Sequence, residues 1–238
     1  MNYKRIKEVL FPRRCICCDK VLDSESSEYG FCRTCEPKIV RASEPVCKKC
    51  GKVLTDDTDE YCRDCGVTRH FFNEGRGVYV YTNSLKAGMY RFKYGNRRCY
   101  SKFFAKDAVD IWGEWLLKKR VDAIIPVPMY RDKQKLRGYN QADVFAKALS
   151  KITGIEVESN LITRMRDTAP MKGLEGAERK ANLKSAFKIV KSDVRLRRVL
   201  IVDDIYTTGT TIDYVAFLLK KAGVDEIYCL YVCVGRGD

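Results

Sequence analysis

Eight cysteines near the start of the chain form four Cys-x-x-Cys pairs, a spacing that is typical of metal sites. Each tight turn lets two sulfurs reach one ion, and two turns complete the tetrahedron that Zn²⁺ accepts from thiolates. Four pairs therefore predict two structural zinc ions, because four thiolates leave no position open for a reacting water. Pairing in chain order, residues 15–35 and then 47–65, is favoured over interleaved pairing, although the spacing allows both. The predicted ligands are Cys15, Cys18, Cys32, Cys35, Cys47, Cys50, Cys62 and Cys65.

A redox function would instead need a single Cys-x-x-Cys pair beside a βαβ unit. Zinc also answers a physical need, because about 70 residues with scattered apolar positions cannot bury much of a core. A structural zinc supplies about 10–16 kcal/mol toward folding. Cys17 lies between ligands and His70 follows the last pair, and neither is predicted to bind metal.

A second chemical motif lies at residues 199–211, where two carboxylates end an apolar run and a Thr/Gly loop follows. Such a run predicts a buried strand, and ligands in open α/β sheets bind at the carboxyl ends of strands. A helix that opens on free backbone N–H groups binds phosphate. Adjacent carboxylates can accept hydrogen bonds from ribose hydroxyls. The motif predicts a ribose 5-phosphate site made of Asp203, Asp204, Thr207, Thr208, Gly209, Thr210 and Thr211.

A basic run follows the apolar stretch at residues 121–128. Its cations, Arg131, Lys133, Lys135 and Arg137, could neutralise a polyanionic leaving group. The plain alternative is a solvated loop.

Strands and helices must position these groups. Residues 73–238 alternate between β-branched runs and amphipathic stretches, which predicts an α/β domain with a mostly parallel sheet. A smaller zinc-binding unit at residues 1–72 precedes this domain. A charged, glycine-containing loop is expected at 164–182, with a short helix at 177–182. The other expected strands are 77–82, 121–128, 161–163, 199–202 and 226–234, and the expected helices are 84–94, 101–119, 140–151 and 211–222.

Charge and hydropathy narrow the class of protein. No apolar run approaches the roughly 20 residues that a membrane span needs, and the first residues are too charged for a signal peptide, so we expect a cytoplasmic protein. The formal net charge is +14. Residues 1–72 hold 14 basic and 12 acidic side chains, which leaves 31 and 19 for residues 73–238. The basic excess therefore lies in the larger domain, where it could meet phosphates or nucleic acid; the alternative is charge for solubility alone.

Residues 199–211 resemble the PRPP-binding motif of type I phosphoribosyltransferases. Together with the four cysteine pairs, the stretches Pro-Val-Pro at 126–128, Arg-Gly-Tyr-Asn-Gln at 137–141 and Glu-Arg-Lys-Ala-Asn at 178–182 resemble the ComF family of competence-associated proteins, including its double-zinc-ribbon members. The resemblance implies a type I phosphoribosyltransferase fold behind a zinc-ribbon module. One departure is Met171, where relatives often carry Gln.

The resemblance also implies residue roles. Asp203 and Asp204 would hold the ribose hydroxyls, and residues 207–211 would hold the 5-phosphate. Arg137 would act with both aspartates in catalysis, and the turn after Pro128 would face the pyrophosphate. Mg²⁺ would accompany PRPP, and residues 164–182 would form the hood over the reacting carbon.

Two functions remain open at this level. The first is transfer of a 5-phosphoribosyl group from PRPP with Mg²⁺. The alternative is a non-catalytic module of the DNA uptake machinery that senses PRPP or binds single-stranded DNA, with competence proteins as further partners. A purely structural adaptor would leave the phosphate motif unexplained. Nothing in the sequence names the acceptor.

Overall fold

The computed structural model describes residues 12–23, 26–167, 186–190 and 195–237. Its centre is a five-stranded sheet with the strand order β1-β7-β6-β2-β3, in which every neighbouring pair is parallel. The strands are β1 (Glu74–Val80), β2 (Ala123–Pro126), β3 (Glu156–Val157), β6 (Arg198–Tyr206) and β7 (Glu226–Val234). The predicted α/β fold with a mostly parallel sheet is confirmed.

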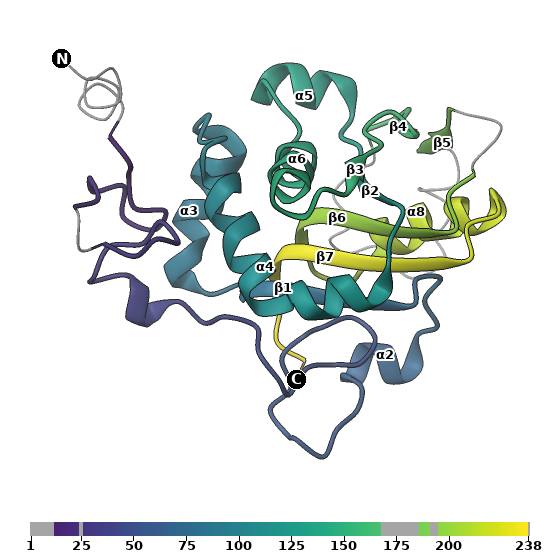
Figure 1. Cartoon of the computed structure of the whole chain (residues 1–238), viewed down its shortest axis with the longest axis horizontal. Helices are drawn as coiled ribbons and strands as arrows, with labels where there is room; N and C mark the ends of the chain where they lie inside the picture. The colour runs from purple at the N-terminus through teal and green to yellow at the C-terminus, as the bar shows by residue number, and fades with distance from the viewer. Residues whose placement is uncertain (1–11, 24–25, 168–185, 191–194, 238) are drawn as a thin grey trace.

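Helices cover both faces of this sheet, as Figure 1 shows. Three helices pack on one face: α3 (Asn83–Tyr94), α4 (Tyr100–Lys119) and α6 (Gln141–Thr153). Helix α8 (Thr210–Lys221) packs on the other. Both faces of β7 are buried, which explains its continuous apolar sequence. The sheet therefore has two separate cores, one on each side.

Local sequence sets the ends of the helices. Asn140 caps α6 by accepting a hydrogen bond from the backbone N–H of Ala142 at 3.1 Å. Gly154 ends the same helix in the left-handed conformation. Helix α3 begins at Asn83, and the residue before it, Thr82, makes no side-chain cap hydrogen bond.

Within the described part of the larger unit, three short elements were not predicted. Helix α5 (Arg131–Arg137) replaces the basic loop, and β3 is only two residues long. Strand β5 (Phe187–Ile189) pairs antiparallel with β4 (Ile162–Arg164), outside the main sheet. Most of the loop expected at 164–182 lies outside the described residues, as do Met171 and the helix expected at 177–182.

The cysteine-rich segment is largely irregular, with only a 3₁₀ turn η1 (Glu36–Lys38) and a short helix α2 (Arg63–Val67). In Figure 1 its first part lies beside α3 and α4, and its second part lies near the C-terminus. Between the two parts, Arg41 pairs antiparallel with Tyr79 and covers the edge of β1. Val53 pairs with Arg236, so the end of the described chain adds to the second part. The larger unit begins close to β1, but the predicted boundary at 72/73 stays a prediction.

No helix among the described residues has the length and apolar character that crossing a membrane requires.

Candidate functional site

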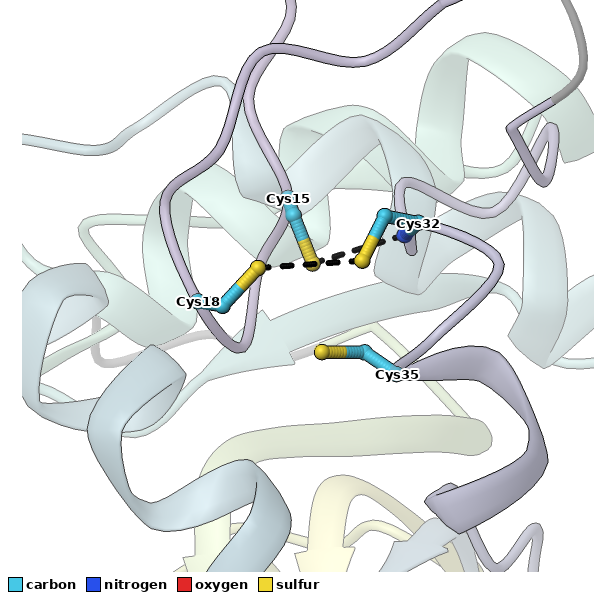
Figure 2. Close-up of side chains that lie close together, drawn as sticks. All are labelled: Cys15, Cys18, Cys32 and Cys35. Carbon is cyan, nitrogen blue, oxygen red and sulfur yellow. Dashed lines mark hydrogen bonds between the residues drawn. The ribbon is translucent and has the colours of Figure 1, made fainter.

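The eight predicted cysteine ligands gather into two clusters, and the pairing follows chain order. The sulfurs of Cys15, Cys18, Cys32 and Cys35 all lie within 4.8 Å of one another, as do those of Cys47, Cys50, Cys62 and Cys65. Figure 2 shows the first cluster, where the Cys18 and Cys32 sulfurs are 3.7 Å apart. A zinc tetrahedron with Zn–S bonds of about 2.3 Å places sulfurs about 3.8 Å apart. Both clusters therefore fit a zinc ion closely.

Electrostatics also favour a cation in the second cluster. Hydrogen bonding from Cys50 holds the pKa of Cys47 well below its usual range. The same contact raises the pKa of Cys50 far above it. Four crowded thiols thus resist losing all their protons together, whereas a dication at their centre would hold all four as thiolates.

Matching turns build the two clusters. In each, the backbone N–H that follows the second cysteine donates to the carbonyl of the first: Asp19 to Cys15 at 3.0 Å, and Gly51 to Cys47 at 2.9 Å. Asp19 and Gly51 both have positive φ, 62° and 75°. Such a turn projects both sulfurs toward the same point, so the short sequence itself shapes half of each tetrahedron.

The two predicted carboxylates lie near the carboxyl end of β6. Asp203 and Asp204 are half-buried, and the Asp204 backbone N–H donates to Asp203 Oδ1 at 2.8 Å. Lys93 Nζ, from the end of α3, lies 3.0 Å from Asp204 Oδ2. Burial and the neighbouring charge of Asp204 raise the pKa of Asp203 to about 7. This carboxyl thus changes its charge close to neutral pH, where it could respond to a ligand.

The threonine and glycine loop follows directly. Gly209 has a φ of 72° and caps α8, and Thr207 and Thr208 are exposed. The hydroxyls of Thr208 and Thr210 are 2.8 Å apart. The first N–H groups of an α-helix have no acceptor within the helix. The loop therefore presents hydroxyl and N–H donors beside two carboxylates, an arrangement suited to a phosphorylated sugar.

Arg137 reaches this edge of the molecule from the end of α5. Its guanidinium donates to the Tyr94 hydroxyl at 2.9 Å and to Gln141 Oε1 at 3.2 Å. It also lies over the Tyr94 ring, 4.6 Å from the centroid. Its positive charge opposes the rise in the pKa of Lys93 that Asp204 causes. Arg137 thus belongs to the same electrostatic neighbourhood as the carboxylates, without a direct contact to them in the described structure.

A basic cavity of about 470 Å³ adjoins α5, close to the turn after β2. Its charged lining residues are Arg131, Lys135 and Arg164. The charge of Arg164 opposes the rise in the pKa of Asp203 that burial and Asp204 cause, which links the cavity to the carboxylates.

Sequence reasoning named neither Lys93 nor Arg164 as a site residue, although Arg164 begins the segment that was expected to form the hood. Each was one cation among many. Only the return of α3 and β4 to this edge of the sheet distinguishes them.

Comparison with known proteins places these features in a family. A double zinc ribbon domain matches residues 6–66, and a phosphoribosyl transferase domain matches residues 144–238. Competence protein F of Haemophilus influenzae is 34% identical over 91% of this chain and 95% of its own length. The chain belongs to the competence protein F family. It is also similar to the DNA utilization protein YhgH of Salmonella typhi, at 30% identity over 86% of this chain and 91% of that protein. Competence protein ComFC of Bacillus subtilis is 22% identical over 88% of this chain and 89% of that protein.

Solved structures show weaker similarity. Glutamine PRPP amidotransferase from B. subtilis gives a TM-score of 0.38 at 18% identity, over 60% of this chain and only 30% of that one. Adenine phosphoribosyltransferase from Thermoanaerobacter pseudethanolicus gives a TM-score of 0.35 at 20% identity, over 56% of this chain and 81% of that one. The fold assignment rests on the sheet topology and the domain match. The protein is thus a competence-related member of this family, with a phosphoribosyltransferase-like domain and two zinc-ribbon clusters.

Proposed function

We propose that the edge of the sheet at residues 203–211 binds the ribose 5-phosphate part of PRPP and that the protein transfers or handles this group. One observation carries the proposal: two adjacent carboxylates lie near the carboxyl end of β6, and a Thr/Gly loop with Gly209 at positive φ opens α8 beside them. Carboxylates accept hydrogen bonds from a ribose diol. The loop offers donors to a phosphate.

The surrounding charges suit a polyanionic leaving group. In transfer, a bond forms between the acceptor and ribose C1 while the bond from C1 to the pyrophosphate oxygen breaks, and pyrophosphate leaves with the electron pair. Arg131, Lys135 and Arg164 line the adjoining cavity and could stabilise that charge. Arg137 would add positive charge from the side of Tyr94.

The carboxylates also fit Mg²⁺. They offer oxygen ligands of the kind it prefers, and the ion usually keeps waters and substrate phosphates as its other ligands. When bound with PRPP, Mg²⁺ would neutralise pyrophosphate charge. Lys93 would hold Asp204 in position, since its Nζ already contacts that carboxylate.

Pyrophosphate release tests whether the group is transferred. The purified protein is incubated with PRPP and Mg²⁺, alone and with a panel of bases and amines. We expect release that depends on an acceptor and is lost in Arg137→Ala. PRPP binding without acceptor-dependent release would instead favour a sensing role for the same site.

A second candidate function, binding of single-stranded nucleic acid, has its own supporting observation. Tyr90 and Tyr94 are exposed, and their rings contact each other at a tilted angle of 44° with 4.9 Å between centroids, with Arg137 over Tyr94. Exposed rings of this kind stack on unpaired bases at about 1–3 kcal/mol each. Phe92, Tyr100 and Tyr139 are buried and cannot contribute. We expect weak, sequence-independent binding that falls with salt and weakens in Tyr90→Ala/Tyr94→Ala, as measured by fluorescence anisotropy.

A further inference from the structure

Buried aromatic rings connect the phosphate loop to the second cysteine cluster. Tyr206, the last residue of β6, is 2% exposed and lies directly against Gly209. A Cβ at Gly209 would be 2.3 Å from the Tyr206 hydroxyl oxygen. The Tyr206 ring packs on Tyr231 at 4.6 Å and edge-on against Phe72 at 6.4 Å. The position of Gly209 therefore depends on where the Tyr206 ring lies.

The other end of this ring stack reaches the second cluster. A Cβ at Gly75 would lie 2.6 Å from the Tyr231 hydroxyl oxygen and 3.2 Å from the Cys50 carbonyl oxygen, so these groups share one contact point. The backbone N–H of Gly75 donates to the Lys49 carbonyl at 2.7 Å. Tyr206 and Tyr231 also belong to the same buried core as Cys47, Cys50 and Cys62, so the rings and this cluster pack as one unit.

The first cluster is connected differently. It packs on α3, where a Cβ at Gly88 would be 2.5 Å from the Ile16 carbonyl oxygen and where Arg91 donates to that oxygen at 2.8 Å. Lys93 extends from the same helix to Asp204. Lys93 is two positions after Arg91, however, so the two side chains point to different sides of α3. Helix α3 thus separates the first cluster from the site, whereas the packed rings of Tyr206 and Tyr231 connect the second cluster to the loop.

We propose that the second cluster, with its zinc bound, holds Tyr206 in place and thereby fixes the phosphate loop, so that zinc there and ribose 5-phosphate at the loop bind cooperatively. Tyr206 is then a positioning residue. The proposal rests on the ribose 5-phosphate site proposed above. Coupling between two sites is reciprocal, so the sugar phosphate must raise the affinity of the second cluster for zinc by the same factor.

Cysteine alkylation in the zinc-loaded full chain tests this reciprocity. The protein is treated with a chelator and N-ethylmaleimide, with and without ribose 5-phosphate, and each cysteine is followed by mass spectrometry. We expect ribose 5-phosphate to reduce alkylation of Cys47, Cys50, Cys62 and Cys65 about fivefold or more. Alkylation of Cys15, Cys18, Cys32 and Cys35 should not change. Equal protection of both clusters, or protection of neither by a ligand that calorimetry shows to bind, would overturn the proposal.

A variant separates the ring from its hydroxyl. Tyr206→Phe keeps the ring and should retain the protection, whereas Tyr206→Leu should lose it. Tyr228→Leu is the matched control, because Tyr228 is a buried tyrosine in the core on the other face of the sheet. Protection that survives in Tyr206→Leu would contradict the role of this ring.

Hydrogen exchange gives a readout that needs no ligand. Cys65→Ser and Cys35→Ser each remove the last cysteine of a cluster, and both residues are half-buried. We expect faster amide exchange across residues 204–213 in Cys65→Ser only. Unchanged exchange in that variant, or equal change in both, would reject the coupling even if ribose 5-phosphate proves not to bind. Failure of the ligand to bind, with the exchange result as expected, would reject the proposed function alone.

Discussion

The two cysteine clusters share a ligand set and a turn geometry but differ in how they join the rest of the molecule. In the first, only Cys15 is fully buried and Cys18 is exposed, whereas Cys47, Cys50 and Cys62 are all buried in the second. The first cluster packs against helices on one face of the sheet. The second shares a core with α8 and the strands on the opposite face. Nearly identical local sequence can therefore serve as a surface attachment in one place and as part of a core in another.

Metal loss should show this difference most strongly. Cys15→Ser and Cys47→Ser each remove a fully buried first ligand. Each change forfeits much of the roughly 10–16 kcal/mol of a structural zinc. We expect Cys47→Ser to lower the melting temperature of the whole protein, because Cys47 lies in the core with α8. Cys15→Ser should loosen residues 12–38 and leave the main unfolding transition nearly in place. Calorimetry with elemental analysis checks both, and the parent should hold two zinc ions per chain.

Substitutions in the two cysteine turns should also destabilise the protein more in the second cluster than in the first, although by less than loss of a zinc ion. A Cβ on Gly51 would lie 2.5 Å from the Gly75 carbonyl oxygen, and its φ of 75° disfavours any side chain. We expect Gly51→Ala to cost about 2–4 kcal/mol of unfolding free energy. Asp19 already carries a side chain at its positive φ and pairs with Arg97 at 3.0 Å. Asp19→Ala should cost about 1 kcal/mol or less. Urea unfolding measures both, and an equal loss would mean that the two turns are equivalent.

A smaller effect should be confined to the first cluster. Arg91 donates to the Ile16 and Cys17 carbonyls and thereby ties the first cluster to α3. We expect Arg91→Met, which keeps most of the apolar stem, to cost about 1–3 kcal/mol of stability. It should speed zinc loss from the first cluster and leave the second unchanged. Zinc release followed with a colorimetric chelator would show two phases, of which only one should move.

The pH dependence of the site adds a test that involves neither cluster directly. The folded pKa of Asp203 is raised to about 7, above the unfolded value near 4. This carboxyl therefore destabilises the ligand-free fold progressively as pH rises from about 4 to 7. We expect Asp203→Asn to stabilise the ligand-free protein by about 1–2 kcal/mol at pH 8 and to make little difference at pH 4. Thermal unfolding at both pH values measures this, and equal stabilisation at both would contradict the raised pKa.

The sequence predicted the parts of the fold whose signals are local. Periodicity placed α3, α4, α6 and α8 within about three residues, and the bounds of β7 were predicted fully. The cysteine spacing predicted both clusters, although only the fold could show that pairing follows chain order.

Signals that arise from tertiary contact were invisible in the sequence. Lys93 is one of many cations until α3 brings it to Asp204. Tyr206 is one apolar residue of a strand until the second cluster and Gly209 close around it. Short elements such as α5 and β3 carry too few residues to show a period.

Binding of ribose 5-phosphate by residues 203–211 can be measured directly. Calorimetric titration of Mg²⁺ and PRPP tests it in the parent, in Asp203→Asn/Asp204→Asn and in the control Asp225→Asn. Asp225 is a half-exposed carboxylate that pairs with Arg197 near the opposite ends of the strands. Amides accept hydrogen bonds more weakly than carboxylates and partly donate. We predict binding in the parent and the control and none in the double variant. Equal affinity in all three proteins would show that Asp203 and Asp204 do not bind the ribose.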